Sequence, residues 1–230
     1  MSSFPTILIA FVGGFLPALF WLWFWLREDN KHPEPKRLIA LSFFFGVLAV
    51  PLAIPFEKMV DAFTVAPMLV LIGWAFVEEV LKYIAAWAGG MHTQAENEPI
   101  DAMVYLVTAA IGFAAAENAI FLIQPLAQGD TFTTLVTGNV RFIGTTLLHV
   151  LSSATIGASV AFSLYKRKRV RIEHLLIGLV LATALHTLFN FFIINSGQHW
   201  MFTIFAVLWF AIVILLLIFE RVKRITRAKR

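Results

Sequence analysis

The chain has 230 residues, of which 60% are apolar and only 14% are charged, and its mean hydropathy is +0.82. Soluble domains carry about a quarter charged residues, so this composition excludes an ordinary soluble domain and indicates a membrane protein. The absence of cysteine excludes disulfides, thiolate metal sites and cysteine nucleophiles. The net charge of +4 comes from short basic runs beside apolar segments, as topology signals do. We therefore expect membrane lipid, and not nucleic acid, as a partner.

Apolar segments follow one another along the whole chain. A helix needs about 20 residues to cross the hydrocarbon of a bilayer, and each segment is long enough, the second only just. They predict an all-α, polytopic bundle of about seven transmembrane helices, forming a single integral domain over residues 1–230 in the cell membrane. The segments are 6–26, 38–55, 66–89, 100–124, 141–165, 172–194 and 200–219.

The distribution of basic residues predicts the orientation of the bundle. Fifteen of the 18 Lys and Arg residues lie at 27–37, at 166–171 and after Glu220. Because cytoplasmic loops are enriched in Lys and Arg, we expect the N-terminus outside and the C-terminus in the cytoplasm. The stretch 125–140 is too polar for lipid and too apolar for a plain linker, and we expect an outer loop that dips back or caps the bundle.

Four successive segments carry polar residues at positions that should be apolar. An ionised side chain at the bilayer centre costs about 2.5 to 3.5 kcal/mol on insertion scales, so such residues face a partner or a water-filled cavity. The residues are Glu78, Glu79 and Lys82, then Glu117 and Asn118, then His149, and finally His186 and Asn190.

These polar residues are expected to meet in one layer. With a rise of about 1.5 Å per residue, Glu117, His149 and His186 lie roughly 21 to 24 Å from the inner ends of their helices. Glu78 reaches the same depth when the predicted inner end of its helix is shifted by about two to four residues, which is the precision of such boundaries. Positions four apart share a helix face, which pairs His186 with Asn190. The predicted site lies at the membrane midplane or just outward of it.

Each residue taken singly also has a structural explanation. Glu78 or Glu79 with Lys82 forms a neutralising pair within one helix, and a lone intramembrane histidine is often a packing residue. Asn118 and Asn190 singly predict hydrogen bonds between helices. The coincidence of two carboxylate helices and two histidine helices at one depth favours a shared function.

The residue types at this depth are those of a hydrolytic metal site. Two histidines and one carboxylate form a typical ligand set for catalytic zinc, with a fourth position open for water. Glu117, His149 and His186 supply that set for one zinc or another divalent metal. Glu78 or Glu79 would then be the general base that takes a proton from the water.

Further residues would support this chemistry. Asn190 would donate a hydrogen bond to the developing oxyanion, Lys82 would limit repulsion between the adjacent glutamates, and Arg141 lies on the same helix side as His149. Two other uses stay open at this point. One is a metal-free site in which Glu78 activates water directly, and the other is a proton or cation pathway.

The combination of residues resembles the PrsW family of intramembrane proteases, which are related to CAAX-processing and bacteriocin-immunity membrane proteases. The resemblance covers residues 76–190 on four successive segments. The CAAX-type relatives have EExxxR and FxxxH, so Glu117 and the position of Lys82 place this chain on the PrsW side. The family motifs occur as Glu78, Glu79 and Lys82 (EExxK), Phe113 and Glu117 (FxxxE), His149, and His186 with Asn190 (HxxxN).

The resemblance implies an intramembrane endopeptidase that hydrolyses a membrane-anchored protein, in the family often an anti-sigma factor cleaved on its outward side. Its expected catalytic residues are Glu78, Glu79, Glu117, His149, His186 and Asn190, with Lys82 and Arg141 in support. The alternatives are a non-catalytic scaffold or immunity protein and a proton-coupled transporter. A transporter would spread its polar residues over the full depth, whereas here they gather in one layer.

Overall fold

The computed structural model describes residues 3–29, 32–195 and 200–225, and within these ranges all regular structure is helical, as predicted. The first half contains α1 (Phe4–Leu26), η1 (Arg27–Asp29), α2 (Lys36–Phe63), α3 (Pro67–Ala86) and η2 (Trp87–Met91). The second half contains α4 (Pro99–Ala127), α5 (Thr131–Val140), η3 (Arg141–Thr145), α6 (Thr146–Ala161), α7 (Lys168–Asn195) and α8 (Met201–Val222).

The helices have the lengths that a bilayer requires. In the described part of the chain, six helical stretches are long and apolar enough to cross a membrane, with α5, η3 and α6 forming one of them. The remaining long helix, α3, carries the buried charged residues Glu78, Glu79 and Lys82. The chain is thus an integral multi-pass membrane protein. Helix α2 continues to Phe63, beyond the predicted end, because membrane helices tolerate internal prolines such as Pro55.

The prediction of an outer loop over 125–140 is wrong. Residues 131–140 form α5, which runs through η3 directly into α6, so the fifth membrane helix begins ten residues earlier than predicted. The Asp130 side chain caps α5 by accepting a hydrogen bond from the backbone N–H of Thr133 at 2.9 Å, which satisfies an otherwise unpaired donor. Packing against α4 further stabilises α5 as a helix, although its sequence is polar.

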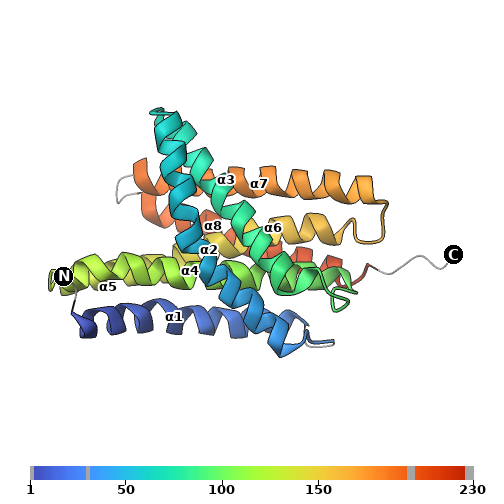
Figure 1. The fold of residues 1–230 in the computed structure, drawn as a ribbon, viewed down its shortest axis with the longest axis horizontal. Helices are drawn as coiled ribbons and strands as arrows, with labels where there is room; N and C mark the ends of the chain where they lie inside the picture. The colour runs from blue at the N-terminus through green and yellow to red at the C-terminus, as the bar shows by residue number, and fades with distance from the viewer. Residues whose placement is uncertain (1–2, 30–31, 196–199, 226–230) are drawn as a thin grey trace.

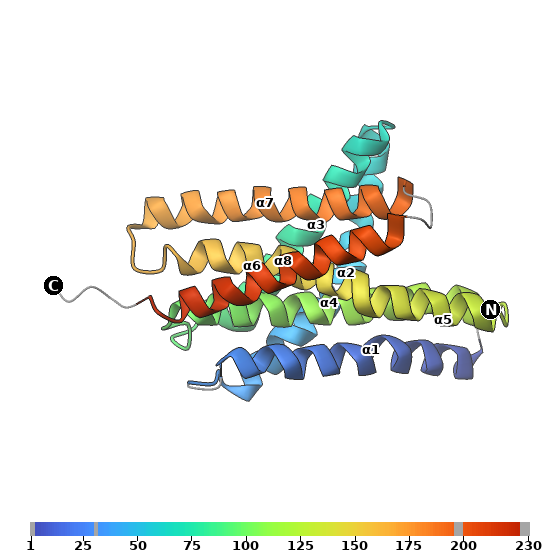
Figure 2. The same cartoon turned by 180° about the vertical axis from the view of Figure 1, so that it is seen from behind.

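Helix α4 lies at the centre of the bundle and packs against α1, α2 and α6 (Figures 1 and 2). Two glycines allow α2 and α4 to approach closely. A Cβ atom on Gly46 would collide with the carbonyl oxygen of Ala109, and one on Gly112 would collide with the carbonyl oxygen of Phe43. Small residues at such contacts let backbones pack together where lipid gives no hydrophobic drive for helix association.

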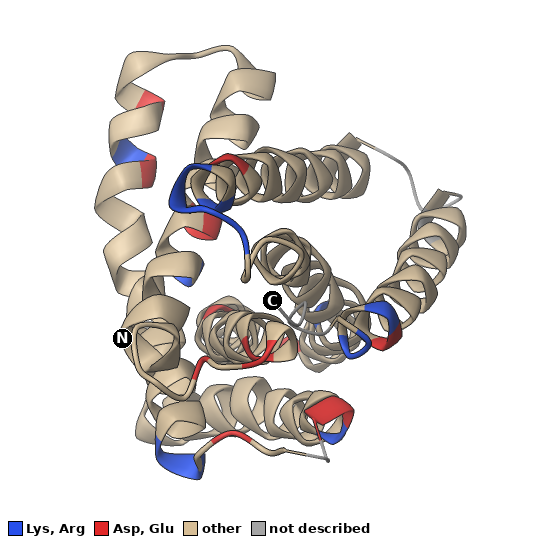
Figure 3. Ribbon diagram, turned by 90° about the vertical axis from the view of Figure 1, so that its right-hand side faces the viewer, with Lys and Arg blue, Asp and Glu red and all other residues tan. Residues whose placement is uncertain are grey.

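Helices α2 and α3 run obliquely across the other helices (Figure 1). The start of α1 and the end of α8 lie at opposite ends of the bundle (Figure 2). Figure 3 shows that uncharged residues make up most of each helix, and that the loop between α6 and α7 is basic. Charged groups inside the bundle are therefore exceptional, and those on α3, α4 and η3 require an explanation.

Candidate active site

The structure brings the predicted residues of α3, α4, α6 and α7 into one connected group. Glu78, Glu79, Lys82, His149 and His186 are all buried. Glu117 and Arg141 lie at the edge of the group, with 20% and 12% of their side-chain surface exposed. Asn190 is half-buried one turn beyond His186 and takes part in none of the contacts described below, so its role stays a prediction.

Glu79 is completely enclosed, with 0% of its side chain exposed. Its Oε1 accepts hydrogen bonds from Lys82 Nζ at 2.6 Å, Ser152 Oγ at 2.7 Å and His186 Nδ1 at 2.8 Å. Its Oε2 accepts a hydrogen bond from Ser153 Oγ at 3.0 Å. Because both oxygens already accept hydrogen bonds, this geometry supports a role for Glu79 in orienting the side chains around it.

These partners fix which nitrogen of each histidine carries the proton. A carboxylate only accepts hydrogen bonds, so His186 Nδ1 donates to Glu79 and the lone pair of His186 is on Nε2. An ammonium only donates, and Lys82 Nζ lies 2.9 Å from His149 Nδ1. His149 therefore has its lone pair on Nδ1, and its Nε2–H donates to Glu117 Oε2 at 2.8 Å.

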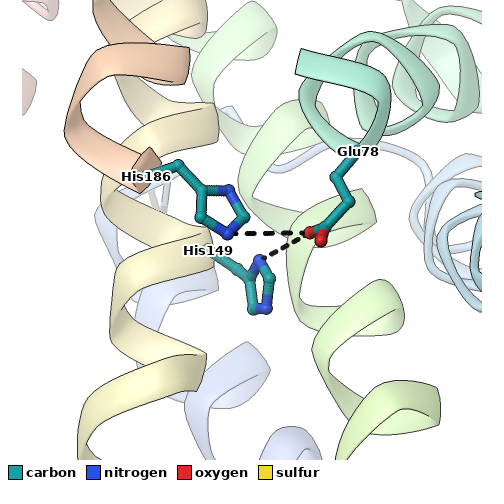
Figure 4. Close-up of side chains that lie close together, drawn as sticks. All are labelled: Glu78, His149 and His186. Atoms are coloured by element: carbon teal, nitrogen blue, oxygen red, sulfur yellow. Dashed lines mark ion pairs between the residues drawn. The ribbon is translucent and has the colours of Figure 1, made fainter. Parts of the chain in front are cut away.

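Both unprotonated nitrogens lie on the side of their rings that is near Glu78 (Figure 4). Glu78 Oε2 lies 3.7 Å from His186 Nε2 and 3.8 Å from His149 Nδ1. This oxygen is buried and has no hydrogen-bond partner, although Lys82 Nζ lies 3.6 Å away. One ligand atom from each of Glu78, His149 and His186 lies within 4.8 Å of the others, so this group has the residue types and proximity of a metal site.

Glu117, predicted as the third ligand, lies on the opposite side of the His149 ring. Its Oε2 contacts His149 Nε2, the nitrogen that points away from Glu78, and lies 2.7 Å from Arg141 Nη2. The geometry therefore groups Glu78, and not Glu117, with the two histidines. Each histidine has a different carboxylate behind it: Glu79 behind His186, and Glu117 behind His149.

Comparison with known proteins identifies the family. The sequence matches the family described as "PrsW family intramembrane metalloprotease" over residues 34–218. The chain belongs to this family. Proteins named Protease PrsW match over most of their lengths, and no solved structure matches.

Three such relatives show the extent of the similarity to PrsW proteins. The protein of Bacillus subtilis (strain 168) is 24% identical over 197 residues, which cover 83% of this chain and 84% of the relative. That of Halalkalibacterium halodurans is 23% identical over 202 residues, covering 84% and 88%. That of Geobacillus kaustophilus is 24% identical over 207 residues, covering 86% and 87%. The chain is thus a membrane protease of the PrsW family along most of its length.

Sequence reasoning missed several residues of this PrsW site. Ser152 and Ser153 lie three and four positions after His149, so they share its helix face, and that spacing was the available signal. The prediction that Asn118 hydrogen-bonds between helices is confirmed, because its Nδ2 donates to Thr146 Oγ1 at 3.0 Å. Asn118 also accepts a hydrogen bond from Arg141 Nε at 2.7 Å, a contact that no motif or spacing indicated.

Proposed function

We propose that the chain hydrolyses peptide bonds of membrane-anchored proteins at a metal centre formed by Glu78, His149 and His186. The observation that carries the proposal is Glu78 Oε2, a buried oxygen without a hydrogen-bond partner that lies 3.7 Å from His186 Nε2 and 3.8 Å from His149 Nδ1. Leaving a buried acceptor unpaired costs about 1 to 3 kcal/mol, and more for a charged group. A cation held among these three residues would remove that cost.

The donor set fits a divalent metal. Two histidines and one glutamate are a ligand set of catalytic zinc sites, which keep a further position open for water. When bound, the metal would polarise the substrate carbonyl and make bound water more acidic. Glu79 and Glu117 would hold the two histidine rings from behind, as carboxylates do in many metal sites.

One contact favours a metal-free variant of the same reaction. Lys82 Nζ already donates to the His149 lone pair at 2.9 Å, which places a cation beside Glu78. In this variant Glu78 would take a proton directly from water, and Asn190 would donate a hydrogen bond to the oxyanion. Glu78 is essential in both versions, because its Oε2 is buried near both histidines and has no hydrogen-bond partner.

We infer that the substrate is a protein anchored in the membrane, and the PrsW resemblance makes an anti-sigma factor the first candidate. The basic residues at 27–37 and 166–171 support a cytoplasmic location for those loops and an outside N-terminus. We further propose that residues 1–230 act as one protease domain, since the hydrophobic core is shared by residues from α1 to α8.

The test compares Glu78→Gln with a matched control, Glu173→Gln, whose side chain is 52% exposed and pairs with Arg169 on the surface. Membranes from cells that produce each protein are analysed by mass spectrometry for new peptide termini. We expect termini that depend on the wild-type chain, persist in Glu173→Gln and vanish in Glu78→Gln. Identical termini in all three samples would reject the proteolytic role of this site.

Metal analysis of the purified chain separates the two versions. The metal-centre proposal predicts about one divalent metal per chain, lost in both His149→Gln and His186→Gln. An active preparation without metal would reject the metal centre and select the version in which Glu78 alone activates water.

A further inference from the structure

We propose that Arg141 is a positioning residue that holds Glu117 against His149 and thereby keeps the His149 proton on Nε2 and its lone pair on Nδ1, the nitrogen nearer Glu78. The proposal extends the proposed function. Only its prediction about metal binding rests on that function. Its first evidence is the shared oxygen: Glu117 Oε2 lies 2.7 Å from Arg141 Nη2 and 2.8 Å from His149 Nε2.

The Arg141 guanidinium is attached to α4 at three points. Besides Glu117, its Nε donates to Asn118 Oδ1 at 2.7 Å. Its Cζ lies 3.9 Å from the centroid of the Phe121 ring, which is a cation–π contact. Glu117, Asn118 and Phe121 are spread over two successive turns of α4, so the guanidinium is fixed in position and in plane.

A closed ring of hydrogen bonds also fixes the Arg141 backbone. Asn118 Nδ2 donates to Thr146 Oγ1 at 3.0 Å, and Thr146 Oγ1 donates to the Arg141 carbonyl oxygen at 3.0 Å. Asn118 and Thr146 are both buried. The ring leads from the Arg141 side chain through Asn118 and Thr146 back to the Arg141 carbonyl. Hydrogen bonds therefore hold both the side chain and the backbone of this residue.

The π-helical turn η3 gives Arg141 the register that this contact needs. Arg141 precedes His149 by eight residues, which in a regular α-helix would rotate the two side chains about 80° apart. One residue absorbed by the π turn makes the spacing equivalent to seven, which leaves about 20°. Such single π turns are frequent at functional sites. Trp21 Nε1 donates to the Phe142 carbonyl oxygen at 3.1 Å, which supports the turn from α1.

The chemical consequence concerns the proton on His149. With Glu117 held in place, Nε2–H has a fixed acceptor and Nδ1 keeps its lone pair. Without the guanidinium, the Glu117 carboxylate, 20% of which is exposed, is free to turn away from His149. Lys82 Nζ at 2.9 Å from Nδ1 then favours the proton on Nε2 without help from a fixed acceptor, so the tautomer is held less strongly. A lysine at position 141 would supply charge without the planar guanidinium, which pairs with Glu117 and donates a hydrogen bond to Asn118 at the same time.

The main experiment reads the His149 proton directly by NMR of the purified full-length chain with ¹⁵N-labelled histidine, at one pH and with chelator. A His149→Gln spectrum assigns the signals. We expect one tautomer with the proton on Nε2 in the wild type, a mixture in Arg141→Met, and an intermediate state in Arg141→Lys. The matched control is Arg169→Met, which removes an arginine that is 91% exposed and should change nothing.

Two further variants make the test independent of any folding failure of Arg141→Met. Glu117→Gln should alter the tautomer, and adding Arg141→Met to it should have no further effect, because residues in one network are not additive. Asn118→Leu keeps the charge of Arg141 but removes the Nε partner, and should resemble Arg141→Lys. A wild-type tautomer in Arg141→Lys and Asn118→Leu, or additive effects in the double variant, would overturn the proposal.

Zinc binding, measured with Zn²⁺ alone against a competing chelator dye, separates this proposal from the proposed function. Loss of the supporting contact should weaken binding about 10- to 100-fold in Arg141→Met and leave Arg169→Met unchanged. A wild type that binds no zinc, with a tautomer that still depends on Arg141, rejects the metal centre and supports the positioning role. Equal zinc binding and equal tautomers in wild type and Arg141→Met overturn the positioning role alone.

Discussion

Replacement by glutamine is expected to lower the unfolding free energy at Glu79 but not at the adjacent Glu78. Glu79→Gln leaves the Lys82 ammonium, which is 0% exposed, without the carboxylate that binds it at 2.6 Å. Removing one partner of a buried ion pair costs about 3 to 5 kcal/mol of unfolding free energy. Glu78→Gln removes a charged oxygen that has no hydrogen-bond partner, so the unfolding free energy should change by less than about 1 kcal/mol or should rise.

The assay is reversible unfolding of the purified full-length chain in mixed micelles by titration with a denaturing detergent. A chelator is present in every sample, because a bound metal would stabilise the wild type by mass action. Both variants should lose proteolysis, but only Glu79→Gln should unfold at a lower detergent fraction, with Glu173→Gln as the surface control. An equal loss of stability in the two variants, or a larger loss in Glu78→Gln, would refute the division of roles between them.

Two other predictions concern the loop after α1 and the packing of α2. Burial raises the pKa of Glu34 from 4.5 to about 7. Its stabilising contribution is therefore complete below pH 4.5 and is lost as the pH rises through about 7. The thermal midpoint of the wild type should fall from pH 5 to pH 8 relative to Glu34→Gln, and parallel curves would contradict this. Gly46→Val places a side chain against the Ala109 carbonyl and should cost at least about 1 to 3 kcal/mol. Gly138→Ala, whose new atom would meet Leu122 at 3.8 Å, should be nearly neutral in the same unfolding assay.

The order of the long helices follows from the sequence because the bilayer imposes their length. Of the seven predicted, six are candidate membrane spans in the described residues, and the seventh, α3, carries the buried charges. The convergence of Glu117, His149 and His186 was also predictable, since the rise of a helix is constant and depth can be counted from its end. The start of the fifth helix was not predictable in this way. Its polar residues 131–137 are those of a loop, and the Asp130 cap and the neighbouring α4 make them helical.

The separate roles of the three glutamates are beyond sequence reasoning for a physical reason. Each is a carboxylate in a membrane helix, and its role depends on which donors face each of its oxygens. Those donors come from distant parts of the chain: His186 is 107 residues from Glu79. A shift of one residue in one helix rotates a side chain by about 100°. The π turn at η3 is such a shift, and no pattern in its sequence predicts it.

The balance of charge connects the metal proposal with the stability prediction. Counted as ionised, the site has three carboxylates and two cations, which leaves one negative charge in excess. Arg141 contacts Glu117 at 2.7 Å, and Lys82 lies closer to Glu79, at 2.6 Å, than to Glu78, at 3.6 Å. The excess charge therefore resides mainly on Glu78, whose Oε2 lies 3.7 Å from His186 Nε2 and 3.8 Å from His149 Nδ1. Glu78→Gln removes that charge and leaves both carboxylate–cation pairs intact. If the metal proposal is correct, this variant should therefore bind the divalent cation more weakly and keep its fold.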